Sequence, residues 1–234
     1  MLFLLLWTVA IYSFAALFHS DIVNAVPLIR QIRYDASLLY LKITMAYTGE
    51  PWWNLIEPTP HYLGAQPQAD WGHEEQVARL NVDAVLILLE EFEERGGWLH
   101  KPVQVHEWAG PLMGMAVYAV RARDFMPLRF VELDAALQWL REQDRKGHRV
   151  YVHCKAGRGR SASVFWAYLI LDYGMAPEDA MARLTRQRPS INIGEAQRQL
   201  VLDYVRYTQC RADPTCIAVH DNRFIMMTAG PPPP

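Results

Sequence analysis

The amino-acid sequence predicts an α/β fold in which a central, mostly parallel β-sheet is flanked by helices on both faces. Helix and strand signals alternate along the 234-residue chain. Two of the strand signals, "DAVLILL" at residues 83–89 and "RVYVH" at 149–153, are almost continuously apolar, as is typical of strands covered on both faces. Hydrophobic residues make up 51% of the chain, enough for one domain with a substantial core.

The first eighteen residues, "MLFLLLWTVAIYSFAALF", contain no charged side chain and approach the minimum length of a membrane-spanning helix. The basic region that usually precedes the apolar run of a signal peptide is missing. We therefore predict an N-terminal hydrophobic helix that, with its linker, forms a membrane anchor over residues 1–33; a signal peptide and a buried hairpin or helix are the alternatives. Arg30, Arg33 and Lys42 follow the run, so the positive-inside tendency places the rest of the chain on the cytoplasmic or matrix-equivalent side.

Residues 34–51 read as an amphipathic helix and linker that either lies on the membrane or, more simply, packs on the domain. Residues 52–210 read as one globular domain. Its expected elements are a short strand near 62–63, a helix at 74–80, strands at 83–89 and 115–120, a helix at 131–147, a strand at 149–153, and helices at 161–174, 177–188 and 195–209. Residues 211–234 lack periodicity, and we expect a flexible tail.

Composition excludes several classes of function. The formal net charge of -2 argues against a general nucleic-acid binder. The eight histidines show no H-E-x-x-H spacing, so we expect no metal site. Three cysteines, an odd number without a C-x-x-C pair, argue against a disulfide framework and favour a reducing compartment.

The stretch "VYVHCKAGRGRS", residues 150–161, surrounds a cysteine with three basic residues. Cys154 follows a predicted buried strand and Arg160 opens a predicted helix, so the residues between them form a tight loop containing Gly157 and Gly159. Backbone N–H groups of such a loop, together with the helix N-terminus, form a cradle for an anion. The same surroundings lower the pKa of a thiol, so Cys154 is expected to be a thiolate and a phosphate group its natural target, with Arg160 as a two-point ligand.

His153, Cys154, Gly157, Arg160 and Ser161 match the H-C-x-x-G-x-x-R-S signature, and on this ground the chain resembles the cysteine-based protein tyrosine and dual-specificity phosphatases. The resemblance implies that residues 52–210 are a phosphatase catalytic domain needing no cofactor. It also implies that Cys154 attacks phosphorus to give a phosphocysteine, that Arg160 binds the phosphoryl group and that the Ser161 hydroxyl stabilises the departing thiolate. The loop residues expected to bind substrate are Lys155, Ala156, Gly157, Arg158 and Gly159.

Expulsion of an alkoxide or phenolate at neutral pH requires a proton donor. Asp124 lies just after the predicted strand at 115–120 and thirty residues before Cys154, on a segment that carries Pro127. We predict that Asp124 is this general acid. Glu107 and Asp134 are the competing carboxyl groups, and Asp134 reads better as part of the first turn of the following helix.

Three stretches, "WWNLIEPTPHYLGAQP", "LNVDAVLILLEEFE" and "YVHCKAGRGRSAS", are similar to mitochondrial dual-specificity phosphatases that act on phosphatidylglycerophosphate, and the similarity runs from Trp52 to Tyr207. By that resemblance, Glu91 and Glu93 would brace the cradle through hydrogen bonds to Arg160 or Arg158. Gln197 would position the hydrolytic water, although it also reads as a helix-surface glutamine.

The sequence therefore predicts a membrane-tethered phosphatase that hydrolyses an anionic lipid headgroup, either phosphatidylglycerophosphate or a phosphoinositide. Lys155 and Arg158 would attract the additional negative charge of such a headgroup. The alternatives are a membrane-anchored dual-specificity protein phosphatase with a phosphoprotein substrate, and a pseudophosphatase that binds phosphorylated ligands. The expected location is the mitochondrial inner membrane, with the endoplasmic reticulum or another membrane as alternatives.

Overall fold

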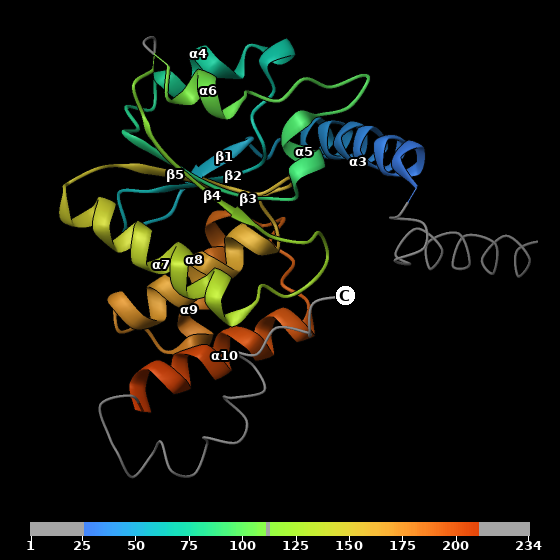
Figure 1. The fold of residues 1–234 in the computed structure, drawn as a ribbon. Coiled ribbons are helices and arrows are strands. Elements are labelled where there is room, and N and C mark those ends of the chain that lie inside the picture. Colours follow the sequence, from blue (N-terminus) through green and yellow to red (C-terminus); the bar gives the residue numbers. More distant parts are fainter. Residues whose placement is uncertain (1–25, 111–112, 211–234) are drawn as a thin grey trace, which may run out of the picture.

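A computed structural model describes residues 26–110 and 113–210 of the chain. Its centre is a five-stranded sheet with the strand order β1-β2-β5-β3-β4, covered by helices on both faces (Figure 1). The strands are β1 (Trp53–Leu55), β2 (Tyr62–Gly64), β3 (Ala84–Leu89), β4 (Ala116–Arg121) and β5 (Val150–His153). Edge strand β1 runs antiparallel to β2 and all other pairs are parallel, so the predicted α/β fold holds, with a mixed sheet.

The helices take up most of the rest of the described chain. They are α3 (Pro27–Thr48), the 3-10 helix η1 (Ala69–Trp71), α4 (His73–Ala78), α5 (Glu91–Arg95), α6 (Val105–Trp108), α7 (Phe130–Arg145), α8 (Arg160–Asp172), α9 (Pro177–Gln187) and α10 (Glu195–Cys210). In Figure 1, α4 and α6 lie on one side of the sheet, whereas α7, α8, α9 and α10 lie on the other.

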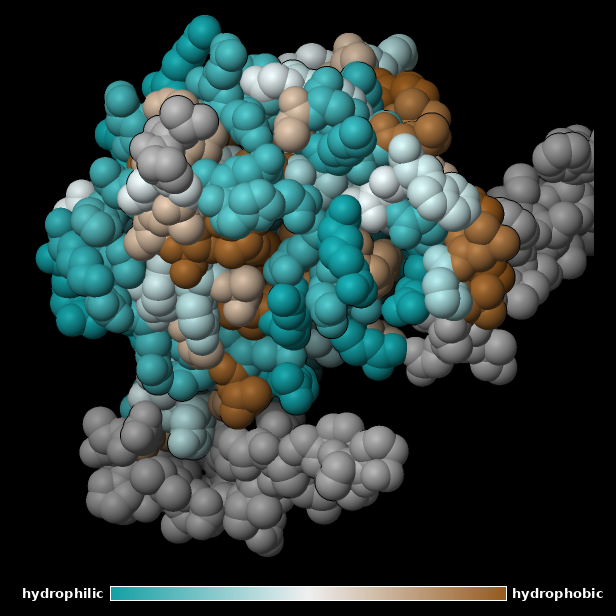
Figure 2. All heavy atoms as spheres, turned by 45° about the horizontal axis from the view of Figure 1, so that its top comes forward, coloured by the Kyte–Doolittle hydropathy of each residue, from teal (hydrophilic) through white to brown (hydrophobic). Residues whose placement is uncertain are grey.

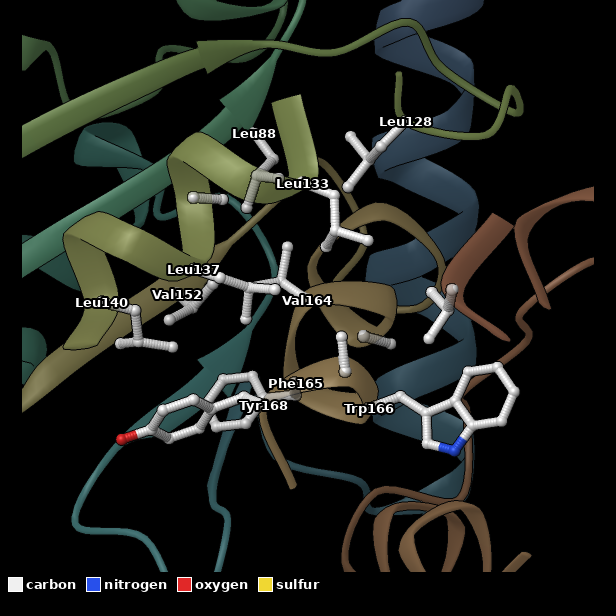
Figure 3. Packing of buried hydrophobic residues seen from close by; sticks show 14 of the residues in the cluster. Leu88, Leu128, Leu133, Leu137, Leu140, Val152, Val164, Phe165, Trp166 and Tyr168 are labelled. Atoms are coloured by element: carbon white, nitrogen blue, oxygen red, sulfur yellow. The ribbon is translucent and has the colours of Figure 1, made fainter. Parts of the chain in front are cut away.

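The larger of the apolar clusters lies between the sheet and helices α7 to α10. Figure 3 shows Leu133 and Leu137 of α7 close to Val152 of β5 and Val164 of α8. Helix α8 is buried at every residue from Arg160 to Ile170, so it runs through the core rather than over it. Burial on all sides fixes the position of its first turn, which is the place where the loop after β5 ends.

Helix α3 packs on the domain, but it begins earlier than the sequence indicated. The predicted helix began at residue 34, whereas α3 begins at Pro27, because proline is well suited to the first turn of a helix. Residues 27–33 therefore belong to the helix and not to a linker. The buried side of α3 contacts Ala65 and is formed by Tyr34, Leu38, Leu41 and Met45.

Several predictions fall on residues that the structure does not describe. The hydrophobic helix of residues 1–18 and the tail from residue 211 lie outside the described ranges. Between residues 26 and 210, leaving out 111 and 112, no helix is long and apolar enough to cross a bilayer. Cys210 is disulfide-bonded, whereas the sequence argued against a disulfide framework.

Candidate active site

The loop that carries Cys154 lies at the carboxyl edge of the sheet. Strand β5 is fully buried between β2 and β3, and it delivers Cys154 to this edge directly before α8 begins at Arg160. Gly157 has a φ of 68°, and a Cβ atom there would lie 2.4 Å from the backbone of Gly64. Only glycine fits both conditions, so the tight turn of this loop depends on it.

The Cys154 thiol is surrounded by donors. Its Sγ accepts hydrogen bonds from the backbone N–H of Gly157 and from the Ser161 hydroxyl, both at 3.2 Å, and only 3% of the residue is exposed. Burial by itself would raise the pKa of the thiol, but the positive charge of Arg160 and these hydrogen bonds outweigh it, and the net pKa is lowered. The site therefore favours the thiolate.

Arg160 is held by two carboxylates at once. Its guanidinium pairs with both oxygens of Glu93, at 2.6 and 3.1 Å, and also donates 2.9 Å hydrogen bonds to the Ala122 carbonyl and to Asp124. Glu93 is completely buried and also accepts a hydrogen bond from the backbone N–H of Glu90, the residue that caps α5. This bidentate pairing fixes the plane of the guanidinium at the pocket.

Glu91 is not part of this arrangement. Its carboxylate pairs with Arg95 at 3.3 Å and its side chain is two-thirds exposed, so the prediction that it braces the cradle is corrected. Residues two apart on a helix point to nearly opposite sides, and therefore only one of Glu91 and Glu93 can face the loop.

Asp124 is the one of the three candidate carboxyl groups that faces the thiol pocket. It contacts the ammonium of Lys155 and the guanidinium of Arg160, and its backbone N–H donates to Glu90 Oε1 at 2.9 Å. Burial would raise the pKa of Asp124, but the charges of Lys155 and Arg160 lower it well below its usual range. Glu107 caps α6, and Asp134 accepts a 2.7 Å hydrogen bond from Tyr204, so both competitors serve other elements.

The remaining predicted residues take several positions around the loop. Lys155 is 6% exposed and lies 3.5 Å from Glu93 as well as beside Asp124, so it points inward. Arg158 lines the pocket, and its guanidinium lies 3.4 Å from the Thr44 hydroxyl of α3. Gln197 also lines the pocket, and its side chain links Gly194 N–H with the Met126 carbonyl of the Asp124 segment.

His153 lies behind the loop and not in the pocket. It is buried, and burial lowers the pKa of its imidazole to about 4, so the ring is neutral at physiological pH. Its Nδ1 lies 3.3 Å from the Cys154 carbonyl oxygen. His153 therefore packs beneath the loop backbone at the end of β5.

Arg188 was missed by the sequence analysis, although it holds the loop from behind. Its guanidinium is fully buried and donates to the carbonyl oxygens of Gly157 at 2.9 Å and of Ala156 at 3.2 Å, and to Asn54 at 2.6 Å. Because these carbonyls are held on the outer side, the N–H groups of the same peptides can turn toward the thiol. In the sequence, Arg188 looks like an ordinary charged residue at the end of a surface helix. Its position directly before Pro189 is the one local feature that distinguishes it from the other arginines of that helix.

A pocket of about 320 Å³ lies over the thiol. The loop of residues 154–160 forms one part of it and Asp124 and Phe125 form another. Its other lining residues are Ser37, Tyr40 and Leu41 of α3, and Asn192, Gly194 and Gln197 near the start of α10. The contribution of α3 was not foreseen, because the sequence places this helix more than a hundred residues before the loop. Across residues 26–110 and 113–210, no cluster of three His, Cys, Asp or Glu side chains could hold a metal ion.

The chain matches the family model of the dual specificity phosphatase catalytic domain over residues 61–206. It therefore belongs to the dual specificity phosphatase family and is a cysteine-based phosphatase. Among its relatives, the human phosphatidylglycerophosphatase and protein-tyrosine phosphatase 1 is 31% identical over 162 residues, which cover 69% of this chain and 77% of the relative. The phosphatidylglycerophosphate phosphatase PTPMT2 of Arabidopsis thaliana is 29% identical over 191 residues, covering 80% of this chain and 78% of the relative.

Solved structures agree with this assignment. PTPMT1 in complex with PI(5)P is similar with a TM-score of 0.60 and 28% identity, over 69% of this chain and 99% of that chain. The active form of Tk-PTP is similar with a TM-score of 0.56 and 27% identity, over 66% of this chain and 96% of that chain. The relatives and structures together make this chain a PTPMT1-like cysteine phosphatase, as the three similar stretches of its sequence indicated.

Proposed function

We propose that the chain hydrolyses a phosphomonoester on an anionic lipid headgroup, phosphatidylglycerophosphate or a phosphoinositide, through a phosphocysteine intermediate. The observation that carries this proposal is the composition of the pocket. Its cationic part, with the thiol and Arg160, suits a phosphate, whereas Tyr40, Leu41 and Phe125 add an apolar wall that suits the glycerol and acyl part of a lipid. Two relatives are named for phosphatidylglycerophosphate, and one similar structure holds PI(5)P.

In the first half of the proposed reaction, the Cys154 thiolate attacks phosphorus from the side opposite the ester oxygen. The S–P bond forms as the P–O bond to the headgroup breaks, and the departing oxygen takes the proton of the Asp124 carboxyl group. Arg160 holds two of the phosphoryl oxygens in the plane that they occupy in the transition state. The product alcohol leaves, and the phosphocysteine remains.

In the second half, water attacks the phosphocysteine. The unprotonated Asp124 carboxylate accepts a proton from this water, and the S–P bond breaks to give inorganic phosphate and the thiolate. Ser161 and the Gly157 N–H already point at Sγ in the free protein, so the donors that stabilise the leaving thiolate need not reorganise. Gln197 lines the same pocket and is proposed to orient the water.

The proposed acid role requires that Asp124 gain a proton when substrate binds. In the free protein Asp124 occupies the cations that a phosphate would use, namely Arg160 and Lys155. An incoming phosphate competes for both cations and adds its own negative charge, and each effect raises the pKa of Asp124. Binding of the substrate phosphate therefore favours the protonated form of Asp124, which is the form that the reaction requires.

The test is a phosphate-release panel with the full chain on phosphatidylglycerophosphate, individual phosphoinositides, and phosphotyrosine and phosphothreonine peptides. We expect the highest catalytic efficiency on one of the lipids. Cys154→Ser should release no phosphate but still bind substrate, because Arg160 and the backbone donors remain while a serine hydroxyl stays protonated. Higher catalytic efficiency on phosphopeptides than on every lipid would contradict this proposal and favour a protein phosphatase. The human relative, which is also named a protein-tyrosine phosphatase, supports that alternative.

The predicted locations are tested separately. The membrane anchor of residues 1–18 and the mitochondrial inner membrane remain proposals that rest on the apolar run and on the resemblance. Fractionation of cells that express the full chain, with extraction by carbonate and by detergent, distinguishes a spanning segment from peripheral attachment.

A further inference from the structure

The outer side of α3 is apolar along the whole helix. At about 100° per residue, an arc of about 120° contains no charged side chain between Pro27 and Thr48. The large exposed residues of this arc are Leu28, Ile32, Leu39, Tyr40, Ile43 and Tyr47, from 46% exposed at Ile32 to 92% at Tyr47. We call this arc the outer face of α3. A helix that only covers a domain would present polar residues there.

The opposite side of the helix is already occupied, because Tyr34, Leu38 and Leu41 are buried against the domain. The outer face is thus a second apolar side that packing within the domain does not explain. Figure 2 shows hydrophobic surface at the right of the view, where α3 lies in Figure 1. Contiguous exposed apolar surface of this kind marks an interaction site.

Two neighbouring segments extend the outer face. The Asp35 carboxylate accepts hydrogen bonds from the backbone N–H groups of Trp98, at 3.0 Å, and Leu99, at 3.3 Å, and holds this turn against α3. Both side chains are about two-thirds exposed. At the other border, the Arg33 guanidinium lies 5.0 Å from the centre of the Phe125 ring, which is 58% exposed and lines the pocket.

The charges on α3 suit a negatively charged partner. The helix carries the basic residues Arg30 and Lys42, and Asp35, its one acidic residue, is 4% exposed; its third cation, Arg33, lies 3.9 Å from the Asp124 carboxylate. Lys42 lies at the border of the outer face, with its ammonium 4.0 Å from the centre of the Trp71 ring. Apolar residues flanked by cations and aromatic rings are typical of helices that lie in the headgroup region of a membrane.

We infer that the outer face of α3, together with Trp98 and Leu99, docks onto the surface of an anionic phospholipid bilayer. Tyr40 belongs both to this face and to the pocket lining, so the docked domain has its pocket mouth at the level of the headgroups. A lipid headgroup can then reach the thiol while its acyl chains stay in the bilayer. This inference rests on the proposed lipid substrate for its benefit to catalysis, but the docking itself depends only on α3 and its neighbours, and not on residues 1–18.

The first arm of the test compares two variants of the full chain that carry the same change in charge. Ile43→Asp/Tyr47→Asp places two carboxylates on the outer face, at positions outside the pocket lining. Val105→Asp/Val131→Asp places them on exposed valines of α6 and α7. The phosphatase activity of each variant is measured on three substrates: phosphatidylglycerophosphate in anionic vesicles, short-chain phosphatidylglycerophosphate below its critical micelle concentration, and a soluble aryl phosphate.

We expect the outer-face variant to lose about tenfold or more of its vesicle turnover, because apolar side chains that enter the bilayer on docking are replaced by carboxylates that an anionic surface repels. Its turnover of the short-chain lipid and the aryl phosphate should match that of the parent, and the valine variant should match the parent on all three substrates. Equal vesicle turnover by both variants would overturn the docking surface. The proposed lipid phosphatase activity is tested separately in the same experiment, by whether the parent chain hydrolyses the lipid substrates.

The second arm does not require lipid hydrolysis. Tyr47→Cys and Val131→Cys chains, each labelled with a polarity-sensitive fluorophore and corrected for labelling of the parent, are mixed with anionic vesicles. The label at position 47 should shift to shorter wavelength and the label at 131 should not. An unchanged label at 47 would reject the inference, as would an equal shift at both positions. A label at 47 that is already shifted without vesicles, and that responds to protein concentration, would assign the face to a second copy of the chain.

Discussion

At the scale of single residues, the site places the Arg160 guanidinium between the sulfur of Cys154, whose pKa it lowers, and the carboxylates of Glu93 and Asp124. The two carboxylates differ in how firmly they are held. Glu93 is fully buried, pairs with Arg160 in two places and accepts from a backbone N–H. Asp124 is 12% exposed at the pocket and makes a single contact with Arg160. We therefore expect a substrate phosphate to displace Asp124 and to leave Glu93 in place.

Asp124→Asn should lower turnover by about a hundredfold to ten-thousandfold on substrates with a poor leaving group, the usual share of general acid catalysis. Asparagine keeps the size of the side chain but has no acidic proton to donate. An aryl phosphate whose phenol has a low pKa needs no such proton, so its turnover should fall much less. Steady-state rates on both substrates check this, and equal losses would mean that the acid is another group.

Glu93→Gln removes the buried partner of Arg160. Because the buried Arg160 guanidinium loses its bidentate carboxylate partner and keeps only the single carboxylate contact with Asp124, the free energy of unfolding should fall by up to about 3 to 5 kcal/mol, measured by urea denaturation. The positive field of Arg160 at the thiol is then less offset, so the pKa of Cys154 should fall further. Alkylation by iodoacetamide as a function of pH, with Cys154→Ser as the background, reports that pKa. A rise in the pKa would contradict the role that we assign to Glu93.

At the scale of elements, the loop of residues 154–159 is shaped from both sides. The buried first turn of α8 fixes its end, and Arg188 holds the carbonyl oxygens of Ala156 and Gly157 from behind. Arg188 follows α9, and it also contacts the Pro51 carbonyl at 3.3 Å. The shape of the loop thus depends on segments that come long before and well after it in the sequence.

Arg188→Met should leave these carbonyl oxygens without donors, at a cost of about 1 to 3 kcal/mol in stability for each buried acceptor that finds no other partner. We expect lower catalytic efficiency toward an aryl phosphate and weaker inhibition by inorganic phosphate, since the N–H groups of the loop lose their alignment. Arg186→Met is the matched control, because Arg186 is an exposed residue of the last turn of α9. Equal behaviour of the two variants in thermal unfolding and phosphate inhibition would exclude this role for Arg188.

The sequence predicted those elements and site residues that are determined by patterns within a single segment. The strands β3 and β5 and helices α7 to α10 were predicted because apolar periodicity and residues such as Pro177 act within one segment. The nucleophile, Arg160 and Asp124 lie together because β5 and β4 run parallel on either side of β3, so their carboxyl ends meet at the same edge of the sheet. The start of α3, the choice between Glu91 and Glu93, and the role of Arg188 depend on contacts between distant segments, which no local pattern records.

At the scale of the whole molecule, stability depends on histidines that are buried in their neutral form. His61, His73 and His153 are each less than 9% exposed, and burial lowers the pKa of each to about 4. His61 and His73 accept hydrogen bonds at Nδ1 from the backbone N–H groups of Val150 and Gln68, both at 3.2 Å. A proton on that nitrogen would break the bond, so the neutral ring is the form that the fold holds.

The unfolded chain binds protons at these histidines below about pH 6.5, whereas the native protein binds them only near pH 4. Their contribution to stability is therefore fully present above pH 6.5 and is lost as the pH falls toward 4. Each histidine adds up to about 1.4 kcal/mol per pH unit to the slope of the unfolding free energy in this window. His73→Asn keeps an acceptor near the position of Nδ1 but cannot titrate, so it should reduce the slope by up to one such contribution. Urea denaturation at intervals between pH 4 and pH 7.5 measures both slopes, and identical slopes for the parent and the variant would show that His73 is not held neutral by the fold.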